Sequence, residues 1–307
     1  MLVVGGENLI DLVQMGTENS LPIYSANPGG SPFNVAMAAG RQGMAVQYIT
    51  PISTDRSGDL LAGRLQESQV SLLAERHSAP SSMAVVSIDE GIPTYSFYRQ
   101  GTAERNVSFD GLKQIMPADA TLFHIGSLGL VGGEDSEAWE AFAQHCKDTG
   151  VLVSLDPNVR ASLVSDAASY RARIQRLMKI ADIIKLSDED LEWLFEGQSE
   201  AEALNVITSI ASASVIVLTR GGDGADMWHE GSWTHMDAAP VDGLKDTVGA
   251  GDTFMATMLV WLSGSEHLSD LSALSCEDKQ VMVARASKAA AINCAQQGCN
   301  PPWSEDL

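Results

Sequence analysis

Short runs of consecutive apolar residues, many of them β-branched, recur along the chain and alternate with longer amphipathic stretches. Runs of this length that are apolar at nearly every position are typical of strands buried on both faces of a sheet. We predict six such strands: Leu2–Val4, Val46–Thr50, Leu122–Ile125, Val151–Leu155, Ile183–Leu186 and Val215–Thr219.

Between these runs, apolar residues recur at the spacing of an amphipathic helix. The first such stretch has Ser31 as its predicted N-cap, Pro32 at the first helical position and Gly43 beyond its end. Strands that alternate with helices predict an α/β fold with a mostly parallel central sheet covered by helices on both faces. The predicted helices are Ser31–Arg41, Glu134–Lys147, Ala167–Ile180, Glu200–Ala211, Ala250–Leu262 and Asp278–Ala295.

Two regions interrupt this alternation. Residues 8–26 are mixed and rich in turn formers, and within residues 83–105 two short strands, Met83–Ile88 and Thr94–Arg99, flank a predicted turn at Gly91. We expect these regions to form a small sheet standing off the main one. Because no linker or repeat divides the chain, we predict a single α/β domain over the whole chain with a small β lid.

The strongest local signal for chemistry is Asp246–Asp252, which reads DTVGAGD and leads directly into an apolar helix. Small residues at a helix N-terminus let backbone amides converge on an anion. In phosphoryl transfer, the amides of Gly249, Ala250 and Gly251 would hold negative charge, and Asp252 would take a proton from the attacking hydroxyl. An acidic residue in a first turn also caps a helix, but capping alone does not call for Gly-Ala-Gly before it.

This heptapeptide resembles the D-T-x-G-A-G-D motif of the ribokinase-like (PfkB) carbohydrate kinases. A second motif, Gly29–Ala36 (GGSPFNVA), resembles the N-terminal glycine motif of the same family. The resemblance extends from Gly5–Asp11 to the small-residue helix Ala284–Ala295 and is closest to the bacterial fructokinases. It implies a ribokinase-like α/β fold and an ATP-dependent sugar kinase.

The resemblance assigns several residues to the sugar. Asp11, at the place of the family's acidic residue after the first strand, would accept hydrogen bonds from neighbouring hydroxyls. Gly29 and Gly30 resemble the glycine pair where the lid hinges over the sugar, and Asn34 resembles the helix residue that hydrogen-bonds it. Each polar residue also has a local interpretation, because Asp11 could cap a turn and Asn34 could be an internally bonded side chain.

Two arginines are further candidates for the sugar site. The stretch from Phe97 to Arg105 resembles the FYR…GTA(D/E)R segment of bacterial fructokinases, in which Arg99 would donate to sugar hydroxyls from the lid. Arg99 could instead be a solvated charge on an edge strand. Arg160, in DPNVR, would suit a phosphate or hydroxyl group near the reaction centre.

The nucleotide side follows two other predicted strands. Lys185–Asp190 (KLSDED) resembles the family's N-x-x-E stretch, with Ser187 in place of the Asn and Asp190 in place of the Glu. Asp190 would act on Mg²⁺ through metal-bound water. Acidic residues that open a helix are also ordinary caps, which is the local interpretation of Asp188 and Glu189. The segment TRGGDG resembles the T-x-G-x-x-G nucleotide loop, with candidate ATP-binding residues Thr219, Gly221, Gly222 and Gly224.

The family resemblance also implies a monovalent cation, K⁺, held by backbone carbonyls of Asp246 and Val248 near Gly298. It further suggests that two copies could pair through their lids into a homodimer.

Composition changes which partners are plausible. The chain has 40 acidic and 19 basic residues and a formal charge of −21, which argues against nucleic acid and anionic membranes as partners. ATP would then need local positive potential from helix amides, Mg²⁺, Lys185, Arg160 and Arg220, with the acidic excess on outward helix faces. Four cysteines without a C-x-x-C pair, and no stretch long enough to span a bilayer, lead us to expect a cytoplasmic protein.

Together these features predict a kinase that uses ATP and Mg²⁺ to phosphorylate the primary hydroxyl of a keto-sugar, with D-fructose as the first choice. Within the family, 2-keto-3-deoxygluconate, ribose and nucleosides are alternatives. A catalytically silent protein that senses sugar or nucleotide is the alternative from another class. A dinucleotide-dependent oxidoreductase is disfavoured because Gly5-Gly6-Glu7 does not supply G-x-G-x-x-G.

Overall fold

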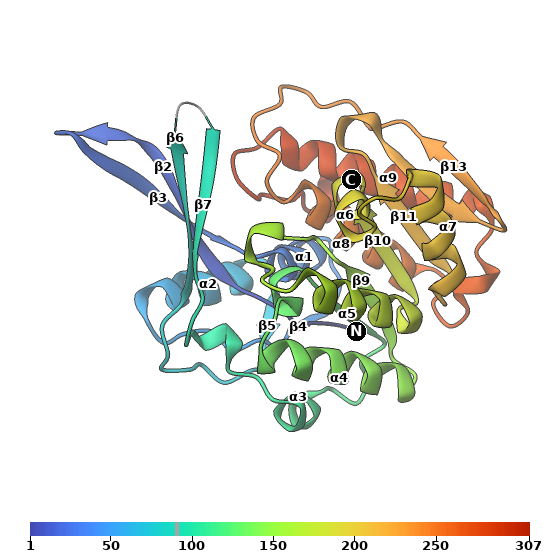
Figure 1. Cartoon of the computed structure of the whole chain (residues 1–307), viewed down its shortest axis with the longest axis horizontal. Coiled ribbons are helices and arrows are strands. Elements are labelled where there is room, and N and C mark those ends of the chain that lie inside the picture. Colours follow the sequence, from blue (N-terminus) through green and yellow to red (C-terminus); the bar gives the residue numbers. More distant parts are fainter. Residues whose placement is uncertain (90–91) are drawn as a thin grey trace.

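The computed structural model describes residues 1–89 and 92–307, so the turn predicted at Gly91 lies outside the described residues. Its strands form two sheets, one of nine strands and one of four. In Figure 1 the smaller sheet stands off the main body as a pair of long hairpins. This arrangement agrees with the predicted central sheet and β lid.

The nine-stranded sheet runs in the order β13-β12-β11-β10-β9-β8-β1-β4-β5. Its strands pair in parallel from β5 to β11, and the last two, β12 and β13, are antiparallel. The mostly parallel sheet predicted from the sequence is therefore confirmed. Its strands are β1 (Leu2–Val4), β4 (Val46–Tyr48), β5 (Val70–Leu72), β8 (Leu122–Gly126), β9 (Leu152–Asp156), β10 (Ile183–Ser187), β11 (Val215–Thr219), β12 (Ala225–His229) and β13 (Ser232–Met236).

Helices cover both faces of this sheet, as parallel strands require. Leu2 and Val4 of β1 pack into one hydrophobic cluster and Val3 into the other, because successive side chains of a strand point to opposite faces. One face holds α1 (Ser31–Arg41), α2 (Arg56–Glu67), α8 (Ala250–Gly264) and α9 (Cys276–Cys294). The other holds α3 (Phe109–Ile115), α4 (Glu134–Asp148), α5 (Ala167–Ile180), α6 (Asp188–Leu194) and α7 (Glu200–Ile210).

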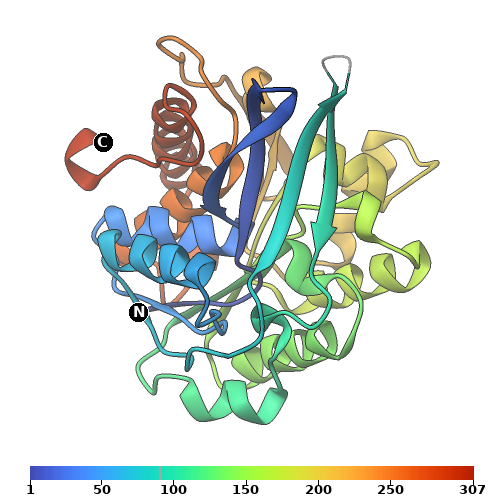
Figure 2. The ribbon, with the colours of Figure 1, turned by 90° about the vertical axis from the view of Figure 1, so that its left-hand side faces the viewer.

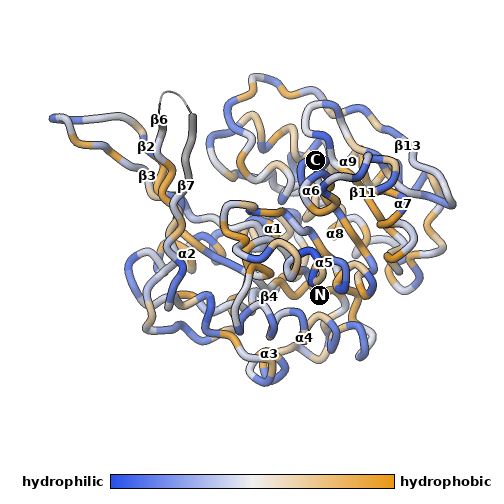
Figure 3. The backbone as a smooth tube through the Cα atoms, viewed as in Figure 1, coloured by the Kyte–Doolittle hydropathy of each residue, from blue (hydrophilic) through white to orange (hydrophobic). Residues whose placement is uncertain are grey.

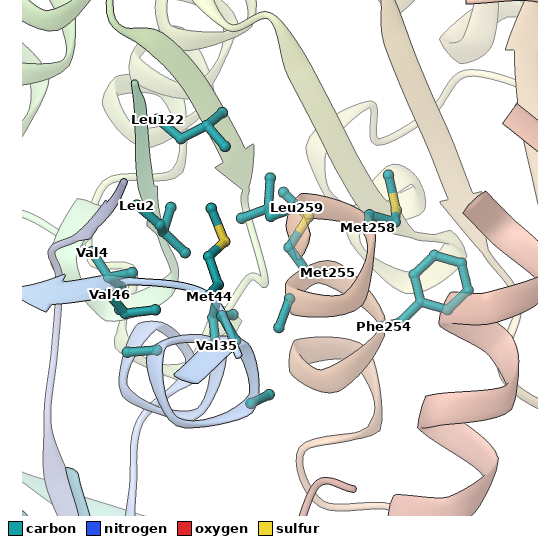
Figure 4. Packing of buried hydrophobic residues seen from close by; sticks show 14 of the residues in the cluster. Leu2, Val4, Val35, Met44, Val46, Leu122, Phe254, Met255, Met258 and Leu259 are labelled. Atoms are coloured by element: carbon teal, nitrogen blue, oxygen red, sulfur yellow. The ribbon is translucent and has the colours of Figure 1, made fainter. Parts of the chain in front are cut away.

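The contact between α1 and α8 is central to the first cluster. Figure 4 shows Met255 and Leu259 of α8 on one side of Met44 and Leu2 of β1 on the other, with Val35 of α1 close to Met44. Leu2, Val35, Met255 and Leu259 are essentially inaccessible to solvent. This packing fixes the N-terminal ends of both helices relative to the carboxyl ends of the strands.

The lid sheet has the order β3-β2-β6-β7, with strands β2 (Leu9–Glu18), β3 (Leu21–Gly29), β6 (Ser82–Asp89) and β7 (Ile92–Tyr98). Figure 2 shows its two hairpins side by side. Residues 8–26 form longer strands than their turn-rich composition suggested. Their turn is confined to Asn19 and Ser20, which have positive φ angles of 50° and 64° that suit a two-residue hairpin loop.

Each predicted strand and helix of the main body is present, with boundaries that differ by at most two residues. The sequence did not indicate the short or mostly polar elements α2, α3, β5, β12 and β13, and for α6 it indicated only the start. Short 3₁₀ turns lie at Ala103–Arg105, Ser127–Leu130, Ala161–Leu163, Gly221–Asp223, Leu271–Ala273 and Ser304–Asp306.

Hydropathy follows the layers. Figure 3 shows hydrophobic stretches along α8 and at the foot of the lid, and hydrophilic stretches on many of the outer loops. Within residues 1–89 and 92–307 no helix is both long and apolar enough to cross a membrane.

The packing of α1 against the edge of the main sheet yields a stability prediction. A Cβ atom at Gly40 would overlap the Ser68 carbonyl oxygen and lie 2.8 Å from Val70 Cγ2. We expect Gly40→Ala to lower the free energy of unfolding by about 1–3 kcal/mol, measured by urea denaturation. Gly63→Ala in α2 is the matched control, because its Cβ would meet nothing within 4 Å. Equal stability of the two variants would contradict the close approach at Gly40.

Candidate active site

Asp252 is the third residue of α8, and its side chain is only 6% exposed. Ser31 Oγ donates to its Oδ1 atom at 2.7 Å, and Asn34 Nδ2 donates to its Oδ2 atom at 2.8 Å. Asn158 Nδ2 also donates to Oδ1, at 3.2 Å. The carboxylate is therefore held from two directions, by the first turn of α1 and by the loop after β9.

Burial raises the pKa of Asp252 above its ordinary value, and the bonds from Asn34 and Ser31 oppose this rise. The positive charges of Lys185 and Arg160 oppose it further. A carboxylate that is more basic than a solvent-exposed one is suited to accept a proton.

The turn before Asp252 depends on glycines. Gly249 caps α8 in the left-handed conformation, with φ of 74°, and a side chain there would overlap Cys299. At Gly251 a Cβ atom would lie 3.2 Å from Lys185 Nζ, so the lysine ammonium reaches this turn closely. The amide of Ala250 already donates to the Thr247 carbonyl at 3.2 Å. Gly249 and Gly251 are thus the better candidates for amides that face an anion.

The glycine pair before α1 allows the lid to meet the main body. A Cβ atom at Gly29 would lie 2.6 Å from Asp11 Oδ2, and one at Gly30 would lie 2.9 Å from the Glu7 carbonyl oxygen. Gly30, with φ of 113°, is the N-cap of α1, so the prediction of Ser31 as the cap is wrong. Ser31 is instead the first helical residue, and its hydroxyl is turned toward Asp252.

Asp11 lies in the first lid strand, β2, rather than at the end of the first strand of the main sheet. Burial raises its pKa to about 6, while the positive charge of Arg160 lowers it and the negative charge of Asp252 raises it. The structure thus brings Asp11, Arg160 and Asp252 into electrostatic reach of one another. Asn34 completes this group through its bond to Asp252.

Lys185 forms a buried ion pair with Asp156 at the carboxyl ends of β10 and β9, with 2.8 Å between Nζ and Oδ2. Burial lowers the pKa of Lys185, but the carboxylates of Asp156, Asp190 and Asp252 raise it more, and the net direction is upward. Burial raises the pKa of Asp156 to about 6 against the pull of Lys185. The acidic excess is therefore not confined to outward faces, and that prediction is wrong at this point.

Ser187 and Asp190 cap α6. Ser187 Oγ accepts the Asp190 amide at 3.0 Å, and Asp190 Oδ2 accepts the Ser187 amide at 3.1 Å, which forms a capping box. Asp190 Oδ1 accepts the Val159 amide at 2.7 Å. The acidic segment does open α6, with Asp188 and Glu189 in its first turn, but the capping box is formed by Ser187 and Asp190. Asp190 also anchors the loop after β9.

The TRGGDG loop lies at the end of β11. Thr219 Oγ1 donates to the Leu186 carbonyl, and Gly224, with φ of 103°, packs closely against the Met236 carbonyl. Gly221 and Gly222 form the 3₁₀ turn between them. Arg220 is bound to Glu200 and Asp226, so its charge is already neutralised and does not supply the free positive potential expected of it.

Asp246 and Val248 lie beside the C-terminal segment. The Asp246 carboxylate accepts the amides of Val248 and Gly298, at 3.0 and 2.9 Å. The Val248 carbonyl accepts Asn293 Nδ2 at 2.8 Å. These bonds tie the start of the DTVGAGD turn to the last turn of α9 and to the chain after it.

Arg99 lies at the foot of the lid and is only 7% exposed, so it is not a solvated edge-strand charge. Its Nε and Nη2 atoms donate to the two carboxylate oxygens of Glu104, at 2.9 and 3.1 Å. Ser82, at the start of β6, donates to the same carboxylate. Arg99 also lines a cavity of about 470 Å³ together with Phe97 and Tyr170. Anchoring of the lid is its clearest role in the structure.

Sequence reasoning missed three residues that surround this site. Ser31 and Asn158 contact Asp252, and Glu7 accepts the amides of Ser31 and Gly129 at 2.9 and 3.2 Å. Ser31 and Asn158 lie inside motifs that had been noticed, GGSPFNVA and DPNVR. The sequence thus showed Ser31 and Asn158 as polar residues inside motifs, but it did not show which residues they contact.

Comparison with known proteins agrees with this geometry. The model of the pfkB family of carbohydrate kinases matches residues 1–306. A fructokinase of Rhizobium leguminosarum bv. trifolii is 32% identical over 280 residues, which cover 91% of this chain and 85% of that protein. A fructokinase of Salmonella typhimurium is 30% identical over 251 residues, 80% of each chain.

Solved structures show the same architecture. A Xylella fastidiosa fructokinase with bound ATP has a TM-score of 0.90 at 24% identity and covers 100% of this chain and 96% of that one. A Vibrio cholerae O395 fructokinase in fructose-, ADP- and calcium-bound form has a TM-score of 0.83 at 25% identity, covering 97% and 94%. Fold and relatives together define a phosphotransferase that acts on an alcohol group of a carbohydrate. The chain belongs to the pfkB family of carbohydrate kinases and has the ribokinase-like α/β fold.

Glu7 yields a prediction about stability and pH. Burial raises its pKa from the ordinary 4.5 to about 7, partly opposed by Arg99. The folded state therefore holds a proton that the unfolded chain releases, and stability falls as pH rises from about 4.5 to 7, by up to about 3 kcal/mol. Glu7→Gln should flatten this fall, measured as urea unfolding free energies at pH 5 and pH 8.

The exposed residue Glu75 provides the control for this measurement. Glu75→Gln should keep the wild-type difference between the two pH values. The titration assigned to Glu7 is refuted if Glu7→Gln shows the same pH slope as the wild type.

Proposed function

We propose that this protein transfers the γ-phosphoryl group of ATP to the primary hydroxyl of a keto-sugar, and that D-fructose, giving fructose 6-phosphate, is its substrate. The observation that carries the proposal is the buried Asp252 carboxylate at the N-terminus of α8, beside Lys185 and held by Asn34. A basic group and positive potential at one place are what transfer from a phosphate to a hydroxyl requires.

Asp252 acts as general base in this proposal. It takes the proton of the attacking hydroxyl, whose oxygen forms the bond to the γ-phosphorus as the bond to ADP breaks in line. The amides of Gly249 and Gly251 and the Lys185 ammonium stabilise the charge on the transferring group. Closure of the lid over the sugar would exclude water, which would otherwise compete as acceptor.

The sugar is proposed to lie between the foot of the lid and α1. Asp11 would accept from sugar hydroxyls, and Arg160, which faces both Asp11 and Asp252, would donate to a hydroxyl or phosphate oxygen. Asn34 Oδ1 is buried with no hydrogen-bond partner among the described residues, so it can accept a hydroxyl beside the base. Gly29 and Gly30 keep this space free of side chains, and Arg99 would reach it from the lid.

ATP is proposed to lie along the C-terminal half of the sheet. A cavity of about 340 Å³ between β12, β13 and α9, lined by Ala225, Met236 and Val283, lies directly beyond Gly224. The base of the nucleotide would enter there, with the Thr219–Gly224 loop beside it and the phosphates directed toward α8. The ATP-bound fructokinase of X. fastidiosa and the ADP-bound one of V. cholerae support a nucleotide on this fold.

The residues around Lys185 fit Mg²⁺. Asp156 Oδ1 is buried without a partner in the described part of the chain, and Asp190 lies within electrostatic reach. No cluster of three or more His, Cys, Asp or Glu side chains able to hold a metal occurs within residues 1–89 and 92–307. That suits Mg²⁺, which keeps several waters and binds one or two carboxylates plus substrate phosphates. Bound there, Mg²⁺ would offset the charge of the β- and γ-phosphates.

The monovalent cation stays a prediction. Of the two backbone carbonyls expected to hold it, that of Val248 accepts Asn293 Nδ2, and the Asp246 side chain beside them accepts the amides of Val248 and Gly298. One of the expected carbonyls therefore already has a hydrogen-bond donor in the structure.

Pairing of two copies through the lid also stays a prediction. Its support is a set of apolar side chains on the lid with large exposed fractions: Met15 56%, Leu21 68%, Ile23 44% and Tyr98 62%. Exposed apolar side chains on a small sheet with open edges favour a covering partner.

Removal of the base is the first functional test. Asp252→Asn keeps the shape of the side chain but cannot accept the proton, so we expect turnover to fall roughly 100-fold to 10,000-fold while the melting temperature changes little. Turnover is measured by coupled ADP release at saturating sugar and ATP. Asp119→Asn, at an exposed position, is the control and should keep wild-type turnover. Near-normal turnover of Asp252→Asn would remove Asp252 as the base.

The choice of sugar is tested by initial rates with D-fructose, 2-keto-3-deoxygluconate, ribose and a nucleoside at equal concentration. We expect the highest kcat/KM for D-fructose, as the fructose-bound V. cholerae fructokinase suggests. A higher kcat/KM for 2-keto-3-deoxygluconate would mean that this sugar acid, and not D-fructose, is the substrate. Sugar binding in calorimetry without ADP release from any acceptor would favour the silent sensor instead.

A further inference from the structure

The donors around Asp252 form an ordered chain. Arg160 Nη1 donates to Asn158 Oδ1 at 2.5 Å, and Asn158 Nδ2 donates to Ser31 Oγ at 2.8 Å. Ser31 Oγ then donates to Asp252 Oδ1 at 2.7 Å. Every bond points from the guanidinium toward the carboxylate, so each polarises the next in the same direction.

The chemistry of the end groups fixes this direction. A guanidinium can only donate, so the Asn158 atom that faces Arg160 must be the carbonyl oxygen, and its amide nitrogen must face Ser31. The Ser31 hydroxyl accepts from that nitrogen and is left with its proton for Asp252. The orientation of the Asn158 side chain therefore follows from its neighbours.

Asn158 and Ser31, which lie between Arg160 and Asp252 in this chain of hydrogen bonds, are each held in place by their backbones. Asn158 has a positive φ of 38°, a conformation that Asn tolerates better than most residues, and the next amide, Val159, donates to Asp190. The Ser31 amide donates to Glu7 Oε1. Two buried carboxylates thus fix the chain segments that carry the donors.

The bonds are distributed unequally over the two oxygens of Asp252. Oδ1 accepts from Ser31 and Asn158, which fills its two acceptor sites. Among the described residues, Oδ2 accepts from Asn34 alone and retains one site. A new donor, such as a substrate hydroxyl, therefore has room at Oδ2.

We propose that Ser31 and Asn158 are positioning residues for phosphoryl transfer: they fill Asp252 Oδ1 and leave Oδ2 as the atom that takes the proton of the acceptor hydroxyl. The inference rests on the proposed function, in which Asp252 is the general base. It assigns different roles to the two oxygens of Asp252. It also identifies a relay, the chain of hydrogen bonds that connects Arg160 to the base through Asn158 and Ser31.

The relay should also act on the ionisation of Asp252, which several charged groups face. Lys185 and Arg160 are the cations, Asp11 and Asp156 are the carboxylates, and the Cys299 thiol lies nearby. Burial raises the pKa of the Cys299 thiol well above its usual range, so it stays neutral. Loss of the Ser31 donor removes a bond to the ionised carboxylate, and the pKa of Asp252 should rise further.

Ser31→Ala tests the proposal. In single-turnover rapid-quench experiments from pH 5 to 9, we expect the transfer rate at neutral pH to fall roughly tenfold or more. The acidic limb of the profile should move by roughly one unit toward higher pH. The KM for the sugar should stay near the wild-type value. Ser31→Thr, which keeps a hydroxyl, should recover both the rate and the limb.

Two further variants guard against misfolding. Asn158→Gly removes the amide donor but keeps the positive φ, so the turn should persist while the acidic limb moves in the same direction. Ser136→Ala, a buried serine in the first turn of α4 whose hydroxyl donates to the Gly133 carbonyl, is the matched control. It should leave the rate and the pH profile unchanged.

The outcomes separate the relay from the base. A wild-type rate and pH profile in Ser31→Ala, with Asp252→Asn inactive, overturns the relay and leaves the proposed function standing. A raised KM with an unchanged rate overturns it also, because Ser31 would then contact the sugar. An active Asp252→Asn overturns the proposed function itself, whatever Ser31→Ala does.

Discussion

The burial of the Asp252 carboxyl group is the constraint on which the arrangement of the site depends. An ionised carboxylate removed from water costs far more than hydrophobic packing can offset unless it is hydrogen-bonded and faced by cations. Here the bonds come from Ser31, Asn34 and Asn158, and Lys185 and Arg160 supply the positive charge. These residues lie on α1, on β10 and in the loop after β9. The contact of α1 with α8 and the register of the central strands must therefore hold for one carboxylate to be stable.

The same site changes the meaning of the net charge of −21. Five carboxylates, including Asp252 itself, lie in or beside it. Lys185 and Arg160 supply positive charge at Asp252 and Arg99 supplies it at Glu7, whereas Arg220 is bound to Glu200 and Asp226. The proposed binding of ATP must therefore be supported by the amides at the start of α8, by Lys185 and by Mg²⁺. Net charge remains informative about nucleic acid and membranes, but it does not describe the field at a phosphate.

The foot of the lid connects to this site through polar groups as well as through the backbone. Glu104 holds both Arg99, just beyond β7, and Ser82, at the start of β6. Burial raises the pKa of Glu7, and the positive charge of Arg99 lowers it by less. The Glu7 carboxylate also accepts the amide of Ser31. A movement of the lid strands would therefore also move the first turn of α1, which carries Ser31 and Asn34, two of the donors to Asp252. Glu7 thus connects the foot of the lid to the site, although its burial costs stability at neutral pH.

The sequence by itself determined the layered α/β fold and the turn before α8. Both depend on local properties. Unbroken apolar runs suit strands buried on both faces, and Gly249, which has no Cβ atom, permits the left-handed cap of α8. The candidate residues for sugar and nucleotide came instead from motifs that resemble those of a known family. Only the tertiary structure decided what they touch. Ser31 was expected to cap α1, yet it meets Asp252 across 221 residues of chain, and Asn158 meets it across 94. Side-chain direction and partner choice depend on how distant elements pack, and no local pattern in the sequence records that.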